Sequence, residues 1–181
     1  GETTFRGGTV TVVDSNILNN QALGSTAPTG GNTGGGGIYS FKNNVVVTRS
    51  TINGNQATNG SGGGIFVEQG NLVVADSTVT NNSAFKSTAV FGGGGIACFT
   101  GTATISGSTI TGNTALGAAF TGGGGGIASS LNSTMTINET VISGDSADIG
   151  GGVVNIYGSQ TQISRSTITG NSSKGGGGLH T

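Results

Sequence analysis

Charged residues are scarce in this chain, and so are several residues that commonly shape folds. Only 7% of its 181 residues are charged, the net charge is −1, Trp is absent, and Pro and Cys occur once each. A net charge this close to zero gives no electrostatic footprint for nucleic acid or for an anionic membrane surface. No apolar run is long enough to cross a bilayer. We therefore expect no nucleic-acid partner and no membrane insertion.

The single cysteine excludes an internal disulfide. Cys98 lies two residues after Ile96, so on a strand both side chains would point the same way. No cationic residue lies near it in the sequence to favour a reactive thiolate. We expect Cys98 to point inward and to pack as a small hydrophobic residue.

Glycine, by contrast, is abundant, with 39 residues arranged in a regular pattern. Runs of Gly end in one aliphatic residue at Ile38, Ile65, Ile96, Ile127, Val153 and Leu179. Between them recurs a second phrase, which reads hydroxyl, polar, aliphatic, polar, small or Asn, then Asn or Asp. Its copies are 15–20, 50–55, 77–82, 108–113, 140–145 and 166–171. Two phrases alternating six times identify a repeat array, and Gly without a three-residue period excludes collagen.

The spacing of the repeats predicts the fold class. Successive copies of the second phrase are 35, 27, 31, 32 and 26 residues apart, which is too variable for the short coils of a left-handed β-helix. Aliphatics two residues apart, such as Val45 and Val47, indicate a strand ahead of each phrase. The phrase itself and the residues after the Gly run would supply two more strands. We predict an all-β, right-handed parallel β-helix of about six coils with three strands each. It would form a single repeat domain over residues 1–181, and we expect it to be a segment of a longer chain.

The last residue of the second phrase is an amide in five copies and a carboxylate in one. These residues are Asn20, Asn55, Asn82, Asn113, Asp145 and Asn171. Asn tolerates left-handed backbone angles and can bond both its own turn and the equivalent Asn one coil away. We predict that these side chains close the turn after the second strand and stack into a structural Asn ladder. Within it, the Asp145 carboxylate must find donors or stay near water.

The two phrases together carry a resemblance. Aliphatic-x-x-Asn paired with Gly-Gly-x-aliphatic resembles the Phe-x-x-Asn and Gly-Gly-Ala-aliphatic repeats of chlamydial polymorphic outer-membrane proteins. The resemblance covers nearly the whole chain, although Ile or Val replaces Phe and Gly replaces Ala. It implies a parallel β-helix in a bacterial cell-surface or secreted protein, and it gives weaker support for adhesion.

Charges recur three residues before the aliphatic of the second phrase. They are Asp14, Arg49, Asp76, Glu139 and Arg165, with Gly107 in the remaining copy. In a stacked rod they would form one outward charged column. One interpretation is a pectate-lyase-like site, in which carboxylates hold calcium and Arg removes a proton. The interpretation that we favour is a ladder of ion pairs between neighbouring coils.

Threonines flank the same aliphatic on the outward side. The pairs are Thr51 with Asn53, Thr78 with Thr80, Thr109 with Thr111, and Thr167 with Thr169. Such rows are similar to the flat faces of ice-binding β-solenoids. Asn16 with Leu18 and Val141 with Ser143 interrupt them, and Thr is also a good strand residue. Ice binding is therefore a minor alternative.

Two loops before Gly runs are unusually apolar and would lie on neighbouring coils. Their large apolar residues are Phe85, Val90, Phe91, Leu116 and Phe120. They would form either a local hydrophobic cap or a docking patch for another protein, and the sequence favours neither.

No residue pattern indicates a catalytic, cofactor or metal site. His180 has no partner cluster, and no Gly-Lys-Ser/Thr follows a Gly run to form a phosphate loop. We predict a non-catalytic structural or interaction module of a bacterial extracellular or cell-surface protein, serving spacing, adhesion or assembly. A protein or a glycan would be its partner, and further chain or a neighbouring molecule would cover its ends. The alternatives are a polysaccharide-active enzyme and an ice-binding solenoid.

Overall fold

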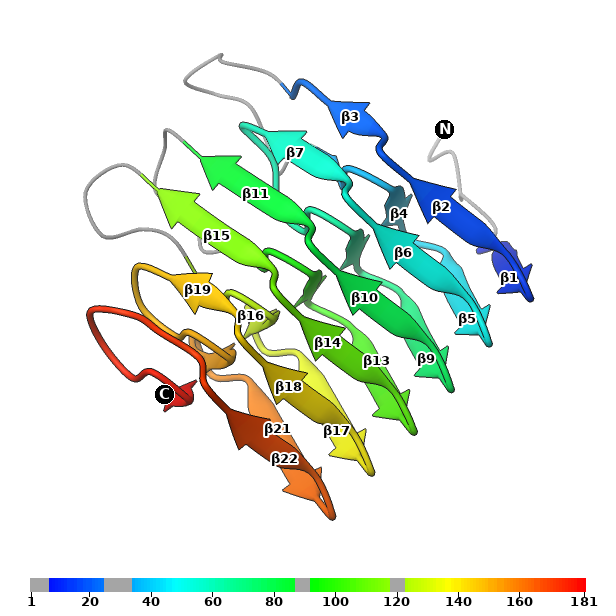
Figure 1. The fold of residues 1–181 in the computed structure, drawn as a ribbon. Helices are drawn as coiled ribbons and strands as arrows, with labels where there is room; N and C mark the ends of the chain where they lie inside the picture. Colours follow the sequence, from blue (N-terminus) through cyan, green and yellow to red (C-terminus); the bar gives the residue numbers. More distant parts are fainter. Residues whose placement is uncertain (1–6, 25–33, 87–91, 118–122) are drawn as a thin grey trace.

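The chain folds as a parallel β-solenoid. The computed structural model describes residues 7–24, 34–86, 92–117 and 123–181, and every regular element in them is a β-strand. The strands form four parallel sheets, named A to D here, that run along the length of the solenoid (Figure 1). No helix that could cross a membrane occurs in these described ranges.

Sheets A and B are built from the two strands on either side of the charged column. Sheet A contains β1 (Thr9–Val13), β5 (Asn44–Thr48), β9 (Asn71–Ala75), β13 (Thr102–Ser106), β17 (Thr134–Asn138) and β21 (Gln160–Ser164). Sheet B contains β2 (Asn16–Leu18), β6 (Thr51–Asn53), β10 (Thr78–Thr80), β14 (Thr109–Thr111), β18 (Val141–Ser143) and β22 (Thr167–Thr169).

Sheets C and D complete the cross-section. Sheet C contains β3 (Gln21–Ala22), β7 (Gln56–Thr58), β11 (Ser83–Lys86), β15 (Thr114–Gly117) and β19 (Ser146–Ala147). Sheet D contains β4 (Ile38–Phe41), β8 (Ile65–Glu68), β12 (Ile96–Phe99), β16 (Ile127–Ser130), β20 (Val153–Asn155) and β23 (Leu179–His180).

The prediction of three strands per coil was wrong, because each full turn has four. Complete turns run over β4–β7, β8–β11, β12–β15 and β16–β19, with partial turns β1–β3 and β20–β23 on either side. Sheets A, B and D thus hold six strands each, one for every copy of the repeat, while the described residues form four complete turns. The missed strand, in sheet C, directly follows the Asn ladder. Its inward residue is Ala22, Ala57, Ala84, Ala115 or Ala147. A strand of two to four residues with one small inward side chain leaves no alternation of large apolar residues to detect.

Equivalent residues of the repeats stack in register, as the repeat predicts. The aliphatic of the second phrase forms one column through sheet B: Ile17, Ile52, Val79, Ile110, Ile142 and Ile168. Together with the inward residues of sheets A and D, this column forms the interior core. Cys98 belongs to this core and is buried and unpaired, which confirms its predicted orientation. Burial raises the pKa of its thiol to about 12, so the group stays a neutral hydrophobe.

A second hydrophobic cluster covers the outward face of sheet D. Phe66 and Phe99 are fully buried there, with ring centroids 5.0 Å apart in an edge-to-face arrangement. Tyr39 stacks on Phe66 at 5.3 Å. Sheet D is therefore apolar on both faces, as buried parallel strands usually are. The repeat pattern alone did not predict this cluster.

Left-handed backbone at the corners lets the chain turn between sheets. Between sheets A and B, the residues of the charged column and Gly107 all have φ between 47° and 56°. Between sheets B and C the left-handed residue is Asn19, Gly54, Asn81, Gly112, Gly144 or Gly170. The prediction that the ladder Asn itself takes this conformation was wrong, because the left-handed residue precedes it by one position. Gly and Asn adopt such angles most readily, which accounts for their use at the second corner.

Candidate functional site

The Asn ladder is the most completely bonded feature of the interior. Nδ2 of Asn82 donates to Oδ1 of Asn113 at 3.0 Å, and the main-chain N of Asn82 donates to the same oxygen at 3.0 Å. Asn55 bonds Asn82 in the same way, and both bonds are 2.9–3.0 Å long. Asn55, Asn82 and Asn113 are buried. The predicted ladder is thereby confirmed, and its side chains are structural because their donors are used along the solenoid.

A parallel ladder of hydroxyl groups runs at the start of sheet B. Oγ of Ser77 accepts a bond from the main-chain N of Ser50, and Oγ of Ser108 accepts one from Ser77 in turn. Each of these two hydroxyls also donates to the main-chain oxygen two residues before it. The second phrase begins with a hydroxyl residue in every copy, but this pattern did not show that the side chains satisfy the main chain at the corner.

The glycines that follow the strands of sheet C leave space for the side chains of the Asn ladder. A methyl group built on Gly95 would lie 3.0 Å from Cγ of Asn113 and 2.7 Å from the carbonyl oxygen of Gly126. Gly64 stands in the same relation to Asn82. The last Gly of these two runs thus lies directly against an amide side chain and against the next turn, which explains why Ala does not take its place.

Asp145 occupies one rung of the ladder and is completely buried. Its Oδ1 accepts bonds from the main-chain N of Asn113 at 2.7 Å and from Nδ2 of Asn113 at 2.9 Å. Its Oδ2 is buried without a hydrogen-bond partner in the described structure. Burial raises the pKa of Asp145 to about 7, and the two bonds from Asn113 oppose that rise.

The charged column lies on the outside, where four of its five charged members form two ion pairs. Arg49 makes a two-pronged ion pair with Asp14, with Nε–Oδ1 and Nη2–Oδ2 distances of 2.7 and 2.8 Å. Nε of Arg165 lies 2.8 Å from Oε1 of Glu139. The Arg49 bond holds the pKa of Asp14 below its usual value. These arginines neutralise neighbouring carboxylates, so the geometry matches an ion-pair ladder better than an acid–base site.

Gly107 occupies the gap in the charged column, beneath the carboxylate of Asp76. The Asp76 carboxylate lies over the next turn, in the space that a side chain at Gly107 would occupy. Gly107 also has a left-handed φ of 56°. Both features favour Gly at this position.

The outward side chains of sheet B form two rows. The first contains Asn16, Thr51, Thr78, Thr109, Val141 and Thr167, and the second contains Leu18, Asn53, Thr80, Thr111, Ser143 and Thr169. Figure 1 shows the six strands side by side in one broad sheet. The rows therefore present hydroxyl and amide groups at the regular spacing of parallel strands, about 4.8 Å.

The predicted docking residues can be placed only in part. Phe85 and Leu116 are register neighbours in sheet C, and each is 46% exposed. Val90, Phe91 and Phe120 lie outside the described residues. The structure thus brings one exposed apolar pair together on the outer surface of sheet C.

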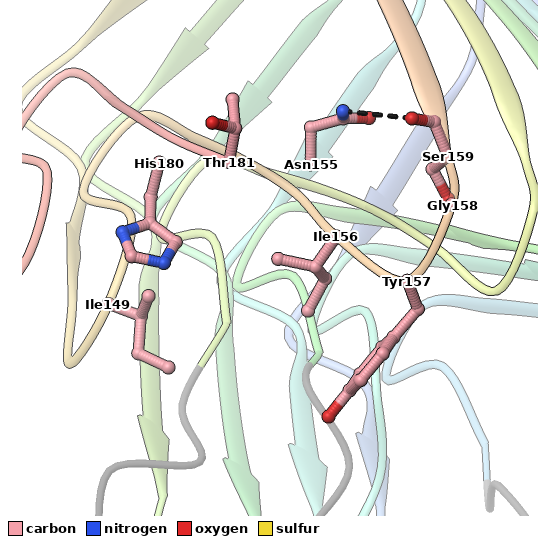
Figure 2. A pocket seen from close by; sticks show the side chains of 8 residues that line it. All are labelled: Ile149, Asn155, Ile156, Tyr157, Gly158, Ser159, His180 and Thr181. Atoms are coloured by element: carbon pink, nitrogen blue, oxygen red, sulfur yellow. Dashed lines mark hydrogen bonds between the residues drawn. The ribbon is translucent and has the colours of Figure 1, made fainter.

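A hollow of about 410 Å³ opens beside sheet D near its last strands. Its lining is Ile149, Asn155, Ile156, Tyr157, Gly158, Ser159, His180 and Thr181. Figure 2 shows His180 and Ile149 on one side and Ile156 and Tyr157 on the other. Nδ2 of Asn155 donates to the Ser159 carbonyl oxygen at 3.0 Å, and Oγ of Ser159 accepts from the main-chain N of Ser133. The hollow is lined mainly by apolar atoms and continues the cluster outside sheet D.

No set of metal-ligand side chains converges in the described residues. The described ranges contain no group of three or more His, Cys, Asp and Glu residues that could hold a metal ion. Comparisons of the chain with protein-family models, curated proteins and solved structures found no match. The resemblance to polymorphic outer-membrane proteins therefore stays a prediction.

Proposed function

We propose that this chain is a non-catalytic structural and interaction module of a bacterial extracellular or cell-surface protein, and that it winds as a right-handed parallel β-helix. Right-handed winding is supported by the strong preference of parallel crossover connections for that hand. An extracellular setting is supported by the scarcity of charge and by the outward Thr, Ser and Asn side chains. The repeat resemblance supports the same setting.

The outward face of sheet B carries this proposal. Its two rows carry hydroxyl and amide groups at one fixed spacing over six strands, apart from Leu18 and Val141. Short side chains such as Thr lose little conformational entropy when a partner covers them. A surface with this repeat fits a partner that also repeats, and a polysaccharide chain offers hydroxyl groups at regular intervals. We infer that sheet B mediates adhesion to such a glycan.

Binding of the purified chain to insoluble polysaccharides tests the proposal. Thr78→Lys with Thr109→Lys places two long charged side chains on neighbouring strands of sheet B. Thr104→Lys with Thr136→Lys makes the same change on neighbouring strands of sheet A. In co-sedimentation with cellulose and chitin particles, we expect the sheet B variant to lose at least about tenfold in affinity, or about 1.4 kcal/mol. The sheet A variant should bind like the wild type.

Two results would contradict this assignment. Equal losses in both variants would show that charge alone, and not the face of sheet B, controls binding. Absence of binding to any polysaccharide on a glycan array would remove glycan adhesion and leave a protein partner or a spacer role.

Ice binding is the second candidate, because the Thr rows of β10 and β14 are in register on one sheet. Leu18 and Val141 interrupt the rows and are both exposed. We therefore expect at most weak thermal hysteresis. Strong hysteresis that is lost in the sheet B variant and kept in the sheet A variant would promote this candidate over glycan adhesion.

A polysaccharide lyase is the remaining alternative. Arg49 would have to leave its two-pronged pair with Asp14 to act on a substrate. We expect no unsaturated product from pectin or alginate, with or without calcium. Product formation that Arg49→Ala abolishes would overturn the non-catalytic proposal.

A further inference from the structure

The ladder amides use each Nδ2 group twice. Nδ2 of Asn82 donates to the Ile52 carbonyl oxygen, one turn back, and to Oδ1 of Asn113, one turn forward. Nδ2 of Asn113 does the same with the Val79 carbonyl oxygen at 3.0 Å and Oδ1 of Asp145 at 2.9 Å. A ladder position is therefore a site that needs one donor group between two acceptors.

At Asp145 this arrangement is interrupted, because a carboxylate oxygen takes the place of the amide nitrogen. Its Oδ1 takes the role of the Asn Oδ1, and its Oδ2 stands where an Asn would carry Nδ2. By the ladder pattern, the acceptors facing that position are the Ile110 carbonyl oxygen and Oδ1 of Asn171. Oδ1 of Asn171 accepts from the main-chain N of Asp145 at 2.8 Å. An ionised Oδ2 would thus face acceptors where the ladder needs a donor.

The surroundings of Oδ2 offer no counter-charge within the described structure. A methyl group built on Gly126 would lie 2.7 Å from Oδ2, so the Gly126 main chain closes that side. The groups bonded to Asp145 in the described ranges are uncharged. Its Oδ1 accepts from the main-chain N and Nδ2 of Asn113, and its main-chain N donates to Oδ1 of Asn171. The charged residues closest to it in sequence are engaged elsewhere: Glu139 with Arg165, and Asp148 with Lys174. A buried carboxylate without donors or a cation is costly, and the usual remedy is to keep its proton.

We propose that Asp145 is a neutral carboxylic acid in the folded solenoid, with Oδ2–H replacing the amide donor of the ladder, and that this rung makes the fold pH-sensitive. The direction of the raised pKa, which reaches about 7, agrees with this geometry. The rung is a pH-sensitive element in a ladder whose other rungs are amides.

The sign of the pH dependence follows from proton linkage. An unfolded Asp has a pKa of about 3.9. Below that pH the carboxyl group is protonated in both states, and the full contribution of the rung is present. Between about pH 4 and about pH 7 only the folded state holds the proton, so the unfolding equilibrium constant rises about tenfold per pH unit. Stability is thus lost as the pH rises towards and through the folded pKa.

Urea unfolding of the wild type and of Asp145→Asn across this range tests the proposal. The substitution restores the donor and removes the proton, and all other titrating groups cancel in the comparison. Between about pH 5 and about pH 7, the ratio of the wild-type to the variant unfolding constant should rise roughly fiftyfold. Carbon-13 NMR of the Asp145 carboxyl group should place its titration near neutral pH.

Asp14→Asn serves as the matched control on the outer surface. Arg49 lowers the pKa of Asp14, so any effect of this carboxylate is lost as the pH falls below about 4, which is the opposite direction. A wild-type to Asp145→Asn ratio that stays constant with pH would overturn the proposal. So would a carboxyl titration near pH 4, since ionised Asp145 would then be held by a bound water or cation.

Discussion

Individual side chains hold neighbouring turns of this solenoid together through bonds that run along its axis. Oδ1 of Asn113 accepts two bonds from Asn82, and its Nδ2 donates to Val79 and Asp145. One buried amide therefore satisfies groups on the turn before it and on the turn after it. Removing it leaves several buried polar groups without partners, which costs more than the bonds themselves contribute.

Asn113→Leu should accordingly lower the free energy of unfolding by about 1–3 kcal/mol. The measurement is urea denaturation monitored by circular dichroism. Asn53→Leu is the matched control, because Asn53 is an outward residue of sheet B whose amide takes only an exposed, 3.3 Å bond from Asn81. Its effect should be close to zero. A near-neutral Asn113→Leu would mean that the ladder does not stabilise the fold.

The sequence predicts the ladder positions because a buried polar residue repeats at one place in every turn. It predicts the inward orientation of Cys98 because Cys98 lies two residues after Ile96 on the same strand. It does not predict which residue bears the left-handed angle, since Asn19 and Asn20 are both Asn and either could adopt it. The pairing of Arg49 with Asp14 follows the favoured interpretation of alternating charge, whereas the position of the Asp76 carboxylate over Gly107 could not be predicted from the sequence.

Among the elements, the Gly runs are the least tolerant of added atoms. The main chain of one run bonds that of the next, as from Gly64 N to the carbonyl oxygen of Gly95 at 3.0 Å. The same stacking brings each run against the ladder. A side chain here would force apart two turns that are held by these bonds.

Gly95→Ala should therefore destabilise the protein by about 1–3 kcal/mol, the usual cost of overpacking. Its Cβ would lie 2.7 Å from the Gly126 carbonyl oxygen. At Gly8, by comparison, an added Cβ meets only Oδ1 of Asn43, at 3.6 Å. Thermal unfolding should show a clear drop in Tm for Gly95→Ala and almost none for Gly8→Ala. Equal shifts would indicate that the Gly runs serve flexibility and not close packing.

Sheets A, B and D were predicted from alternation and from the residue after each Gly run. Sheet C was missed because its strands are short, although an Ala two residues after each ladder position, from Ala22 to Ala147, is its signal. The cluster outside sheet D was missed because Phe66 and Phe99 alternate with the inward residues Ile65, Val67, Ile96 and Cys98, so both faces of these strands are apolar. Periodicity of two cannot separate a strand buried on both faces from one that is not.

In the whole molecule, equivalent residues of successive turns lie side by side in all four sheets. A register shift by one residue would turn the core of a sheet outward. The interior columns, the Asn ladder and the hydroxyl ladder all depend on one register. The proposed glycan-binding face depends on it too, because its rows exist only if β10 and β14 are aligned.

Disulfide formation between β10 and β14 tests that register most directly. Thr78 and Thr109 are register partners on β10 and β14. Adjacent strands are about 4.8 Å apart, which falls within the Cα separation that a disulfide accepts. Thr78→Cys with Thr109→Cys should cross-link readily under mild oxidation, while buried Cys98 stays unreactive. Thr78→Cys with Thr111→Cys joins the same strands two residues out of register, beyond the limit of about 7 Å, and should remain reduced. Cross-linking of the second pair in place of the first would contradict the in-register solenoid.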